Sequence, residues 1–262
     1  EQLLREFMLY STKQPWFFTE FSFLFTFGVF LFFYAILFTQ NALRKVYLIA
    51  FSLFFYYKSS GPFLGLFLFQ IIIDYFFARK IERTEGNAKQ IWATIAVLFS
   101  LSFLLYFKYA NFLIENTNWL LLTHFESVDL FLPIGISFYT FQSISYLVDV
   151  YRGEIRASKN ITDYAFYMTF FPHLVAGPIV RAKDFLNQVN SPESPDARRY
   201  KESLLRIILG LLKKLLIADY LGKYVDMVFE NPSFYTGGEN LLGAVAYSFQ
   251  IYFDFSGYSD IA

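Results

Sequence analysis

Long uncharged stretches alternate with short polar segments along the chain. A helix needs about 20 mostly apolar residues to cross the hydrocarbon core of a bilayer, which is roughly 30 Å thick. Stretches that meet or approach this length before residue 151 are 21–38, 46–57, 63–78, 91–106 and 130–150. The second is short and predicts a thin or tilted span. Two or three more embedded segments are expected within 167–185, 204–225 and 241–255. The pattern predicts an all-α, polytopic integral membrane protein with one membrane domain over 1–262.

Basic residues indicate an orientation, because lysine and arginine collect in the short cytoplasmic loops of membrane proteins. The segment 79–90 carries Arg79, Lys80, Arg83 and Lys89, whereas 110–127 carries no lysine or arginine. We therefore expect the first segment in the cytoplasm and the second outside. Alternation then places the N-terminus outside the cytoplasm and the stretch from Arg152 onward inside. Within that stretch, 152–214 carries 11 basic residues against six acidic ones.

Pro172, Gly177 and Pro178 interrupt the apolar segment 167–185. Proline removes a helical hydrogen bond and clashes with the preceding turn, so a continuous spanning helix is excluded here. The segment predicts a re-entrant or interfacial hairpin with His173 at its tip. A single histidine in this setting is more often a structural hydrogen-bonding residue than a catalyst.

Composition narrows the classes of function. Hydrophobic residues make up 56% of the chain and charged residues 17%, with 22 basic against 22 acidic side chains. A neutral balance gives no basic surface for nucleic acid. The chain has no cysteine and two histidines, which excludes disulfides and thiolate chemistry and predicts no metal site.

Two groups of polar residues lie in apolar surroundings, where a charged side chain costs about 2.5–3.5 kcal/mol on insertion scales. The first shares one face of the predicted helix 130–150 and comprises Tyr139, Gln142, Tyr146 and Asp149. The second lies in the last segment, 247–262, and comprises Gln250, Asp254, Ser256, Ser259 and Asp260, with a predicted break at Ser256 and Gly257. Each group fits either a contact between helices or the wall of a cavity. In 204–225, Lys213 and Lys214 fit an amphipathic interfacial helix, and attraction of an anionic ligand is the alternative.

Four motifs carry a family resemblance. They are LPIGISFYTFQSISYLVDVYRGEI (132–155), FFPHLVAGPIVRAKDF (170–185), LGLLKKLLIADYL (209–221) and FQIYFDFSGYSDIA (249–262). In this order they resemble the membrane-bound O-acyltransferase (MBOAT) family over about 45–262. The similarity is to the bacterial branch with the alginate O-acetyltransferase membrane subunit and the D-alanyl transfer protein of teichoic acid synthesis.

The resemblance implies a multi-helix bundle with re-entrant and interfacial helices in the bacterial inner membrane. It implies transfer of an acyl group, through a funnel, from a cytoplasmic thioester to a hydroxyl of an exported polysaccharide. Acetyl-coenzyme A or an acylated carrier protein would serve as substrate, with no bound cofactor. The expected partners are membrane lipid, the polysaccharide, and acyl carrier or periplasmic acetylation proteins.

The family's essential histidine usually stands in a tryptophan-histidine-glycine context, which 1–262 does not contain. We therefore assign no catalytic residue here, and expect an N-terminal part that lacks the catalytic helices and is inactive alone. The candidate funnel-lining residues are His173, Gln142, Asp149, Asp254, Ser256, Tyr258 and Asp260. The competing hypotheses are a transporter or flippase for a polysaccharide or lipid precursor, and a protein that acts only in assembly with partners.

Overall fold

The computed structural model describes residues 10, 16, 21–37, 41–174, 179–190 and 196–261, which contain helices and no strand. This confirms the all-α prediction. The chain divides into two compact units, one made of 1–175 with 179–190 and the other of 176–178 with 191–262. The single membrane domain over 1–262 stays a prediction.

The first unit begins with two apolar helices, α2 (Phe21–Ile36) and α3 (Asn41–Ser60). The α3 helix has 20 residues and is therefore longer than the span predicted over 46–57. The helix continues through the charged residues that flank 46–57, because these residues have partners within the protein. Lys45 Nζ lies 2.5 Å from Asp163 Oδ1. Lys58 is buried, and its Nζ lies 5.2 Å from the ring centroid of Trp16.

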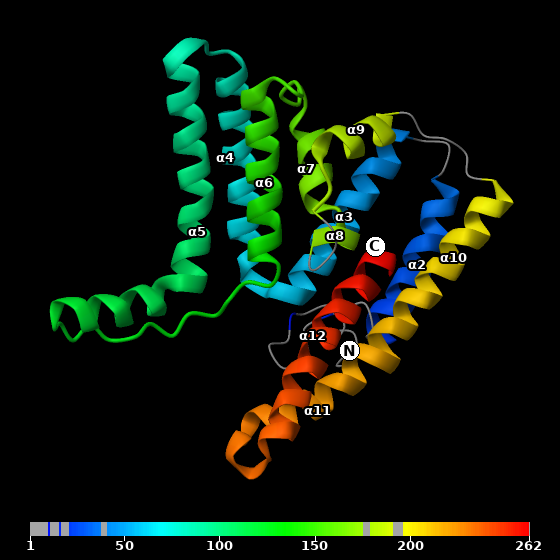
Figure 1. The fold of residues 1–262 in the computed structure, drawn as a ribbon. Helices are drawn as coiled ribbons and strands as arrows, with labels where there is room; N and C mark the ends of the chain where they lie inside the picture. Colours follow the sequence, from blue (N-terminus) through cyan, green and yellow to red (C-terminus); the bar gives the residue numbers. More distant parts are fainter. Residues whose placement is uncertain are drawn as a thin grey trace. The chain divides into compact units, whose positions relative to one another are not determined.

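A sharp change of direction follows at Gly61, whose φ of +58° favours glycine. It opens a short 3₁₀ turn (Gly61–Phe63) that leads into α4 (Leu64–Glu82) and then α5 (Gly86–Leu121). The stretches Ala42–Glu82, bent at Gly61, and Gly86–Leu121 are long and apolar enough to cross a membrane. Helix α5 continues into the predicted loop 110–127 and bends part-way along its length (Figure 1).

Helix α6 spans Ile136–Arg152 and therefore starts later than the predicted 130–150. Pro133 and Gly135, the latter at φ +77°, end the irregular segment before it. That segment is fixed to α5 by two asparagines: Asn111 bonds both the N–H and the carbonyl of Val128, and Asn118 does the same with Phe125. His124 in this segment is exposed.

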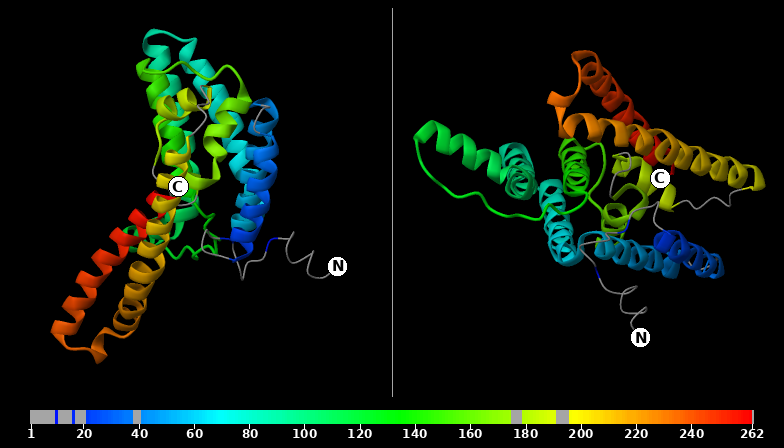
Figure 2. Two further views of the ribbon diagram at one scale, coloured as in Figure 1. Left: turned by 90° about the vertical axis from the view of Figure 1, so that its right-hand side faces the viewer. Right: turned by 90° about the horizontal axis from the view of Figure 1, so that it is seen from below.

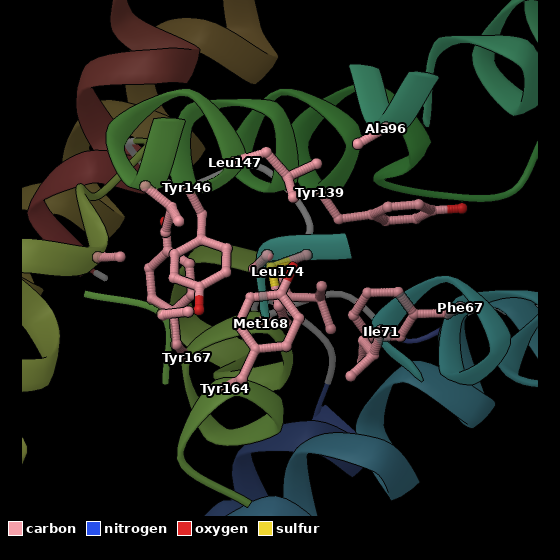
Figure 3. Close-up of a cluster of buried hydrophobic side chains, with 14 of the residues drawn as sticks. Phe67, Ile71, Ala96, Tyr139, Tyr146, Leu147, Tyr164, Tyr167, Met168 and Leu174 are labelled. Carbon is pink, nitrogen blue, oxygen red and sulfur yellow. The ribbon is translucent and has the colours of Figure 1, made fainter. Parts of the chain in front are cut away.

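The core of the first unit lies where α4 and α6 meet α7 (Ile161–Thr169) (Figure 3). Tyr139 and Tyr146 of α6 and Tyr164 and Tyr167 of α7 are fully buried. The Tyr146 and Tyr164 rings lie 4.6 Å apart between centroids. Large aromatic side chains thus hold α6 and α7 together through contact area.

The proline-rich segment 167–185 is broken, as predicted. Helix α7 ends at Thr169, the four-residue helix α8 covers Phe171–Leu174, and α9 covers Ala182–Asn190. Phe171 anchors α8, since its ring lies 5.1 Å from that of Phe51 in α3 and 5.6 Å from that of Phe27 in α2. Residues 175–178, which belong to the predicted hairpin, and residues 191–195 lie outside the described residues.

In the second unit, α10 (Ala197–Leu212), a π-helical segment (Lys213–Ala218) and α11 (Asp219–Glu230) follow one another without a break. After a 3₁₀ turn (Pro232–Phe234), α12 (Gly237–Ile261) runs back alongside them (Figures 1 and 2). The break predicted at Ser256 and Gly257 is wrong, because α12 is helical to Ile261. In the first turn of α12, Glu239 accepts hydrogen bonds from the N–H and hydroxyl of Thr236, which lower the pKa of the Glu239 carboxyl.

Candidate functional site

Two glycines bring α10 and α12 into backbone contact. A Cβ on Gly210 would lie 2.7 Å from the carbonyl oxygen of Gly257, and a Cβ on Gly257 would lie 2.9 Å from that of Gly210. Small residues allow such an approach in membrane helices. The contact places the residues that follow Gly210 directly against the C-terminal half of α12.

Those residues form the π-helical segment, which begins with Lys213 and Lys214. A π turn closes i to i+5 hydrogen bonds, and such turns are frequent at functional sites. Here the wider turn pairs residues five apart: Lys214 Nζ lies 2.8 Å from Asp219 Oδ1.

Both lysines also reach across to α12. Lys213 Nζ lies 2.5 Å from Asp260 Oδ2 and donates a hydrogen bond to Ser256 Oγ at 3.0 Å. Lys214 Nζ lies 2.6 Å from Asp254 Oδ1. The charged side chains are 18–43% exposed, so they form a half-buried cluster. We call Lys213, Lys214, Asp219, Asp254, Ser256 and Asp260 the lysine–aspartate cluster.

This cluster brings together three predicted site residues, Asp254, Ser256 and Asp260. The fourth from α12, Tyr258, is buried, and its ring centroid lies 5.6 Å from Lys214 Nζ. The sequence pattern of the lysines fits an interfacial helix or attraction of an anionic ligand, and neither predicts their pairing with the aspartates of α12. The available signal was that lysines in one apolar stretch and aspartates in another both need partners.

The balance of charge limits what the cluster binds. Three carboxylates face two ammonium groups, so the lysines do not form an open anion site. Asp254 Oδ2 and Asp260 Oδ1 form no hydrogen bond or ion pair with the described residues. These oxygens can accept hydrogen bonds from the hydroxyls of a ligand. Within the described residues no group of three His, Cys, Asp or Glu side chains could hold a metal ion.

The other predicted residues belong to the first unit. Gln142 is 2% exposed and donates through Nε2 to the Tyr167 carbonyl at 3.0 Å. Asp149, 6% exposed, lies on the same face of α6. This face of α6 therefore makes contacts inside the first unit, including the hydrogen bond from Gln142 to α7. His173 belongs to α8, but its side chain lies outside the described part of the structure.

Asp74 of α4 is a buried acid that is not among the predicted site residues. It is fully buried and accepts hydrogen bonds from Ser143 Oγ at 2.5 Å and Ser100 Oγ at 3.2 Å. Gln70, one turn earlier, is also fully buried. An ionisable residue in the middle of an apolar helix signals such a site in sequence. Asp74 joins α4, α5 and α6 by polar contacts.

The four sequence motifs lie within a stretch of the chain that matches a known family. Residues 95–262 match the model of MBOAT, the membrane-bound O-acyltransferase family. The chain belongs to this family. Together with the two helical stretches long enough to span a bilayer, membership makes the chain an integral membrane protein.

Curated relatives come from the same family branch that the motifs indicated. The probable alginate O-acetylase AlgI of Azotobacter vinelandii is 40% identical over 227 residues, covering 84% of this chain and 45% of that protein. The peptidoglycan O-acetyltransferase of Helicobacter pylori is 35% identical over 245 residues, covering 83% and 46%. The teichoic acid D-alanyltransferase of Streptococcus thermophilus is 29% identical over 135 residues, covering 49% and 32%. The chain spans less than half the length of these MBOAT relatives.

Proposed function

We propose that the protein is a membrane O-acyltransferase that acetylates hydroxyl groups of an exported polysaccharide. The observation that carries the proposal is similarity over most of the chain to relatives named as alginate O-acetylase and peptidoglycan O-acetyltransferase. The polymers in these names, alginate and peptidoglycan, both carry sugar hydroxyls. We therefore propose only the class of polymer that this protein modifies, a polymer with sugar hydroxyls.

The proposed reaction transfers an acetyl group from a thioester to a sugar hydroxyl. The hydroxyl oxygen forms a bond to the acetyl carbonyl carbon, the bond from that carbon to sulfur breaks, the hydroxyl proton leaves, and the thiol is released. The donor is acetyl-coenzyme A or an acylated carrier protein. A positioned base typically speeds such a step by about 10²–10⁴-fold, and we propose that the family's histidine supplies it from outside residues 1–262.

Within the described residues, we propose that the lysine–aspartate cluster lines the route of the acceptor. The second oxygens of Asp254 and Asp260 would accept hydrogen bonds from sugar hydroxyls, while the lysines hold the carboxylates in place. Tyr258 is buried beside Lys214 and supports the cluster from within the helix contact. This assigns Asp254 and Asp260 to binding and positioning.

The proposed setting is the bacterial inner membrane with the N-terminus outside the cytoplasm. The basic segment 79–90 supports a cytoplasmic turn there, since lysine and arginine concentrate on that side. The thioester would arrive from the cytoplasm, and periplasmic acetylation proteins would receive or share the acceptor. Membrane lipid surrounds the exposed apolar side chains.

The proposal is tested by deleting the gene in its host and measuring alkali-released acetate per unit of exported polysaccharide. Deletion should lower the acetate content, and the wild-type gene should restore it. The double variant Asp254→Asn with Asp260→Asn should restore much less than the matched change Asp226→Asn, at an exposed position of α11. Unchanged acetate content with an altered amount of exported polymer would contradict the proposal and favour a transporter or flippase.

A further inference from the structure

The first unit contains a hollow of about 480 Å³ at the C-terminal end of α4. This volume lies within the range of small-molecule sites. Its apolar part is formed by Ile73, Phe76 and Phe77 of α4 and Trp92 of α5. Phe76 is 61% exposed, and the core residues of α4, such as Phe67 and Ile71, are not among the lining residues. The hollow therefore opens on the outer surface of α4 and α5, where a membrane protein meets lipid.

Three cations line the same hollow: Arg79, Lys80 and Arg83. None of them forms an ion pair within 4 Å in the described part of the chain. Lys80 Nζ lies 5.4 Å from the Trp92 ring centroid, and the neighbouring acid, Glu82, accepts a hydrogen bond from the Ala157 N–H. The cations are thus available to an anionic group.

An apolar wall beside a cluster of cations matches an amphiphile with an anionic head. Basic pockets at the membrane boundary between spanning helices bind the head groups of anionic lipids. A small soluble anion would use the cations but leave the four apolar side chains without a partner. A neutral lipid would cover the apolar wall but leave three positive charges uncompensated.

We propose that this hollow is a binding site for an anionic phospholipid. The phosphate lies among Arg79, Lys80 and Arg83, and the first part of an acyl chain lies along Phe76, Phe77 and Trp92. Under the proposed orientation the lipid belongs to the cytoplasmic leaflet. A detergent micelle has no leaflets. A measurement of lipid binding in detergent therefore depends neither on that orientation nor on the proposed acyltransferase activity.

The test is native mass spectrometry of the full-length protein in detergent, titrated with phosphatidylglycerol and with phosphatidylcholine of identical acyl chains. Each surface cation contributes about a fivefold factor to binding of anionic lipid. The triple variant Arg79→Gln, Lys80→Gln, Arg83→Gln should therefore bind phosphatidylglycerol on the order of 100-fold more weakly, with phosphatidylcholine binding unchanged. The matched control Arg198→Gln, Lys201→Gln, Arg206→Gln removes the same charge from α10 and should change binding by less than about threefold.

Two single variants test the two halves of the site without relying on the triple variant. Arg83→Glu, at an exposed position, reverses one charge and should weaken phosphatidylglycerol binding about 25-fold. Phe76→Ala keeps all charges and should weaken it several-fold. Equal binding of the two lipids, an equal loss in the α10 control, or displacement of phosphatidylglycerol by millimolar glycerol phosphate would overturn the proposal.

Discussion

Asp74 shows how a single polar residue is accommodated inside an apolar helix. Its oxygens accept hydrogen bonds from Ser100 on α5 and Ser143 on α6, so one carboxyl group joins three helices. Buried polar groups require such partners, because an unpaired one costs about 1–3 kcal/mol. The residue therefore specifies how the three helices meet.

Replacing Asp74 should separate its hydrogen-bonding role from its size. Asp74→Ala leaves the Ser143 hydroxyl without its acceptor and should lower the free energy of unfolding by about 1–3 kcal/mol. Asp74→Asn keeps an acceptor oxygen and should cost less. Thermal unfolding in detergent measures both, and an equal loss in the two variants would contradict this role.

Gly257 tests the close approach of α10 and α12. A Cβ there would lie 2.9 Å from the Gly210 carbonyl oxygen and 3.2 Å from the backbone nitrogen of Lys214, so the helices must separate to admit it. Gly257→Ala should therefore destabilise the protein by about 1–3 kcal/mol. Gly65→Ala is the matched control, because nothing lies within 4 Å of a Cβ at that position of α4. Comparable melting temperatures for the two variants would show that the contact is looser than described.

Sequence patterns predict some of these residues better than others. The spacing of Tyr139, Gln142 and Tyr146 predicts one helical face, and all three are buried on α6. The pairing of Lys213 with Asp260 has no such local signal. It depends on the backbone contact between Gly210 and Gly257, which forms only when two distant helices pack.

At the scale of elements, α8 is a short helix held by the buried side chains of Phe171 and Leu174. Its four residues are too few to be stable alone, because helix nucleation is costly. Phe171 is 6% exposed and packs among rings of α2 and α3, including Phe27, Phe51 and Phe55. This contact fixes the segment that carries His173.

Phe171→Ala should lower the free energy of unfolding by about 3 kcal/mol and speed hydrogen exchange of the α8 amides. The matched control is Phe32→Ala, since Phe32 of α2 is 66% exposed and faces lipid in the proposed setting. The control should change stability by less than about 1 kcal/mol. Unchanged exchange at 171–174 in Phe171→Ala would show that another contact holds α8.

The sequence predicts the boundary of an element only where a residue that cannot continue a helix, such as proline, occurs. Pro172 correctly marks the break after α7, whereas α5 runs on to Leu121 through Lys108 and Glu115. Polar residues end an apolar stretch but not a helix, since lysine and glutamate are good helix formers. The apolar pattern thus locates the membrane-facing part of α5 and misses its length.

At the scale of the whole molecule, the distribution of charge predicts which side of the membrane each connection faces. The chain has no cysteine, so a single introduced cysteine is the one thiol in 1–262. Glu126→Cys, in the exposed segment before α6, should react with a membrane-impermeant maleimide in intact cells. Glu85→Cys, in the exposed turn between α4 and α5, should react only after permeabilisation. The reverse pattern would overturn the proposed orientation.

We propose that the protein transfers acetyl groups and that the lysine–aspartate cluster positions the acceptor. The most direct measurement is transfer of labelled acetyl to polysaccharide in inverted membrane vesicles of the host, supplied with labelled acetyl-coenzyme A or acetylated carrier protein. Wild-type membranes should label the polymer. Lys214→Gln, which removes the partner of Asp219 and Asp254, should lower labelling at least about tenfold, whereas Lys223→Gln, at an exposed position of α11, should not. Absence of labelling in wild-type membranes with both donors, or equal labelling in the two lysine variants, would contradict the account.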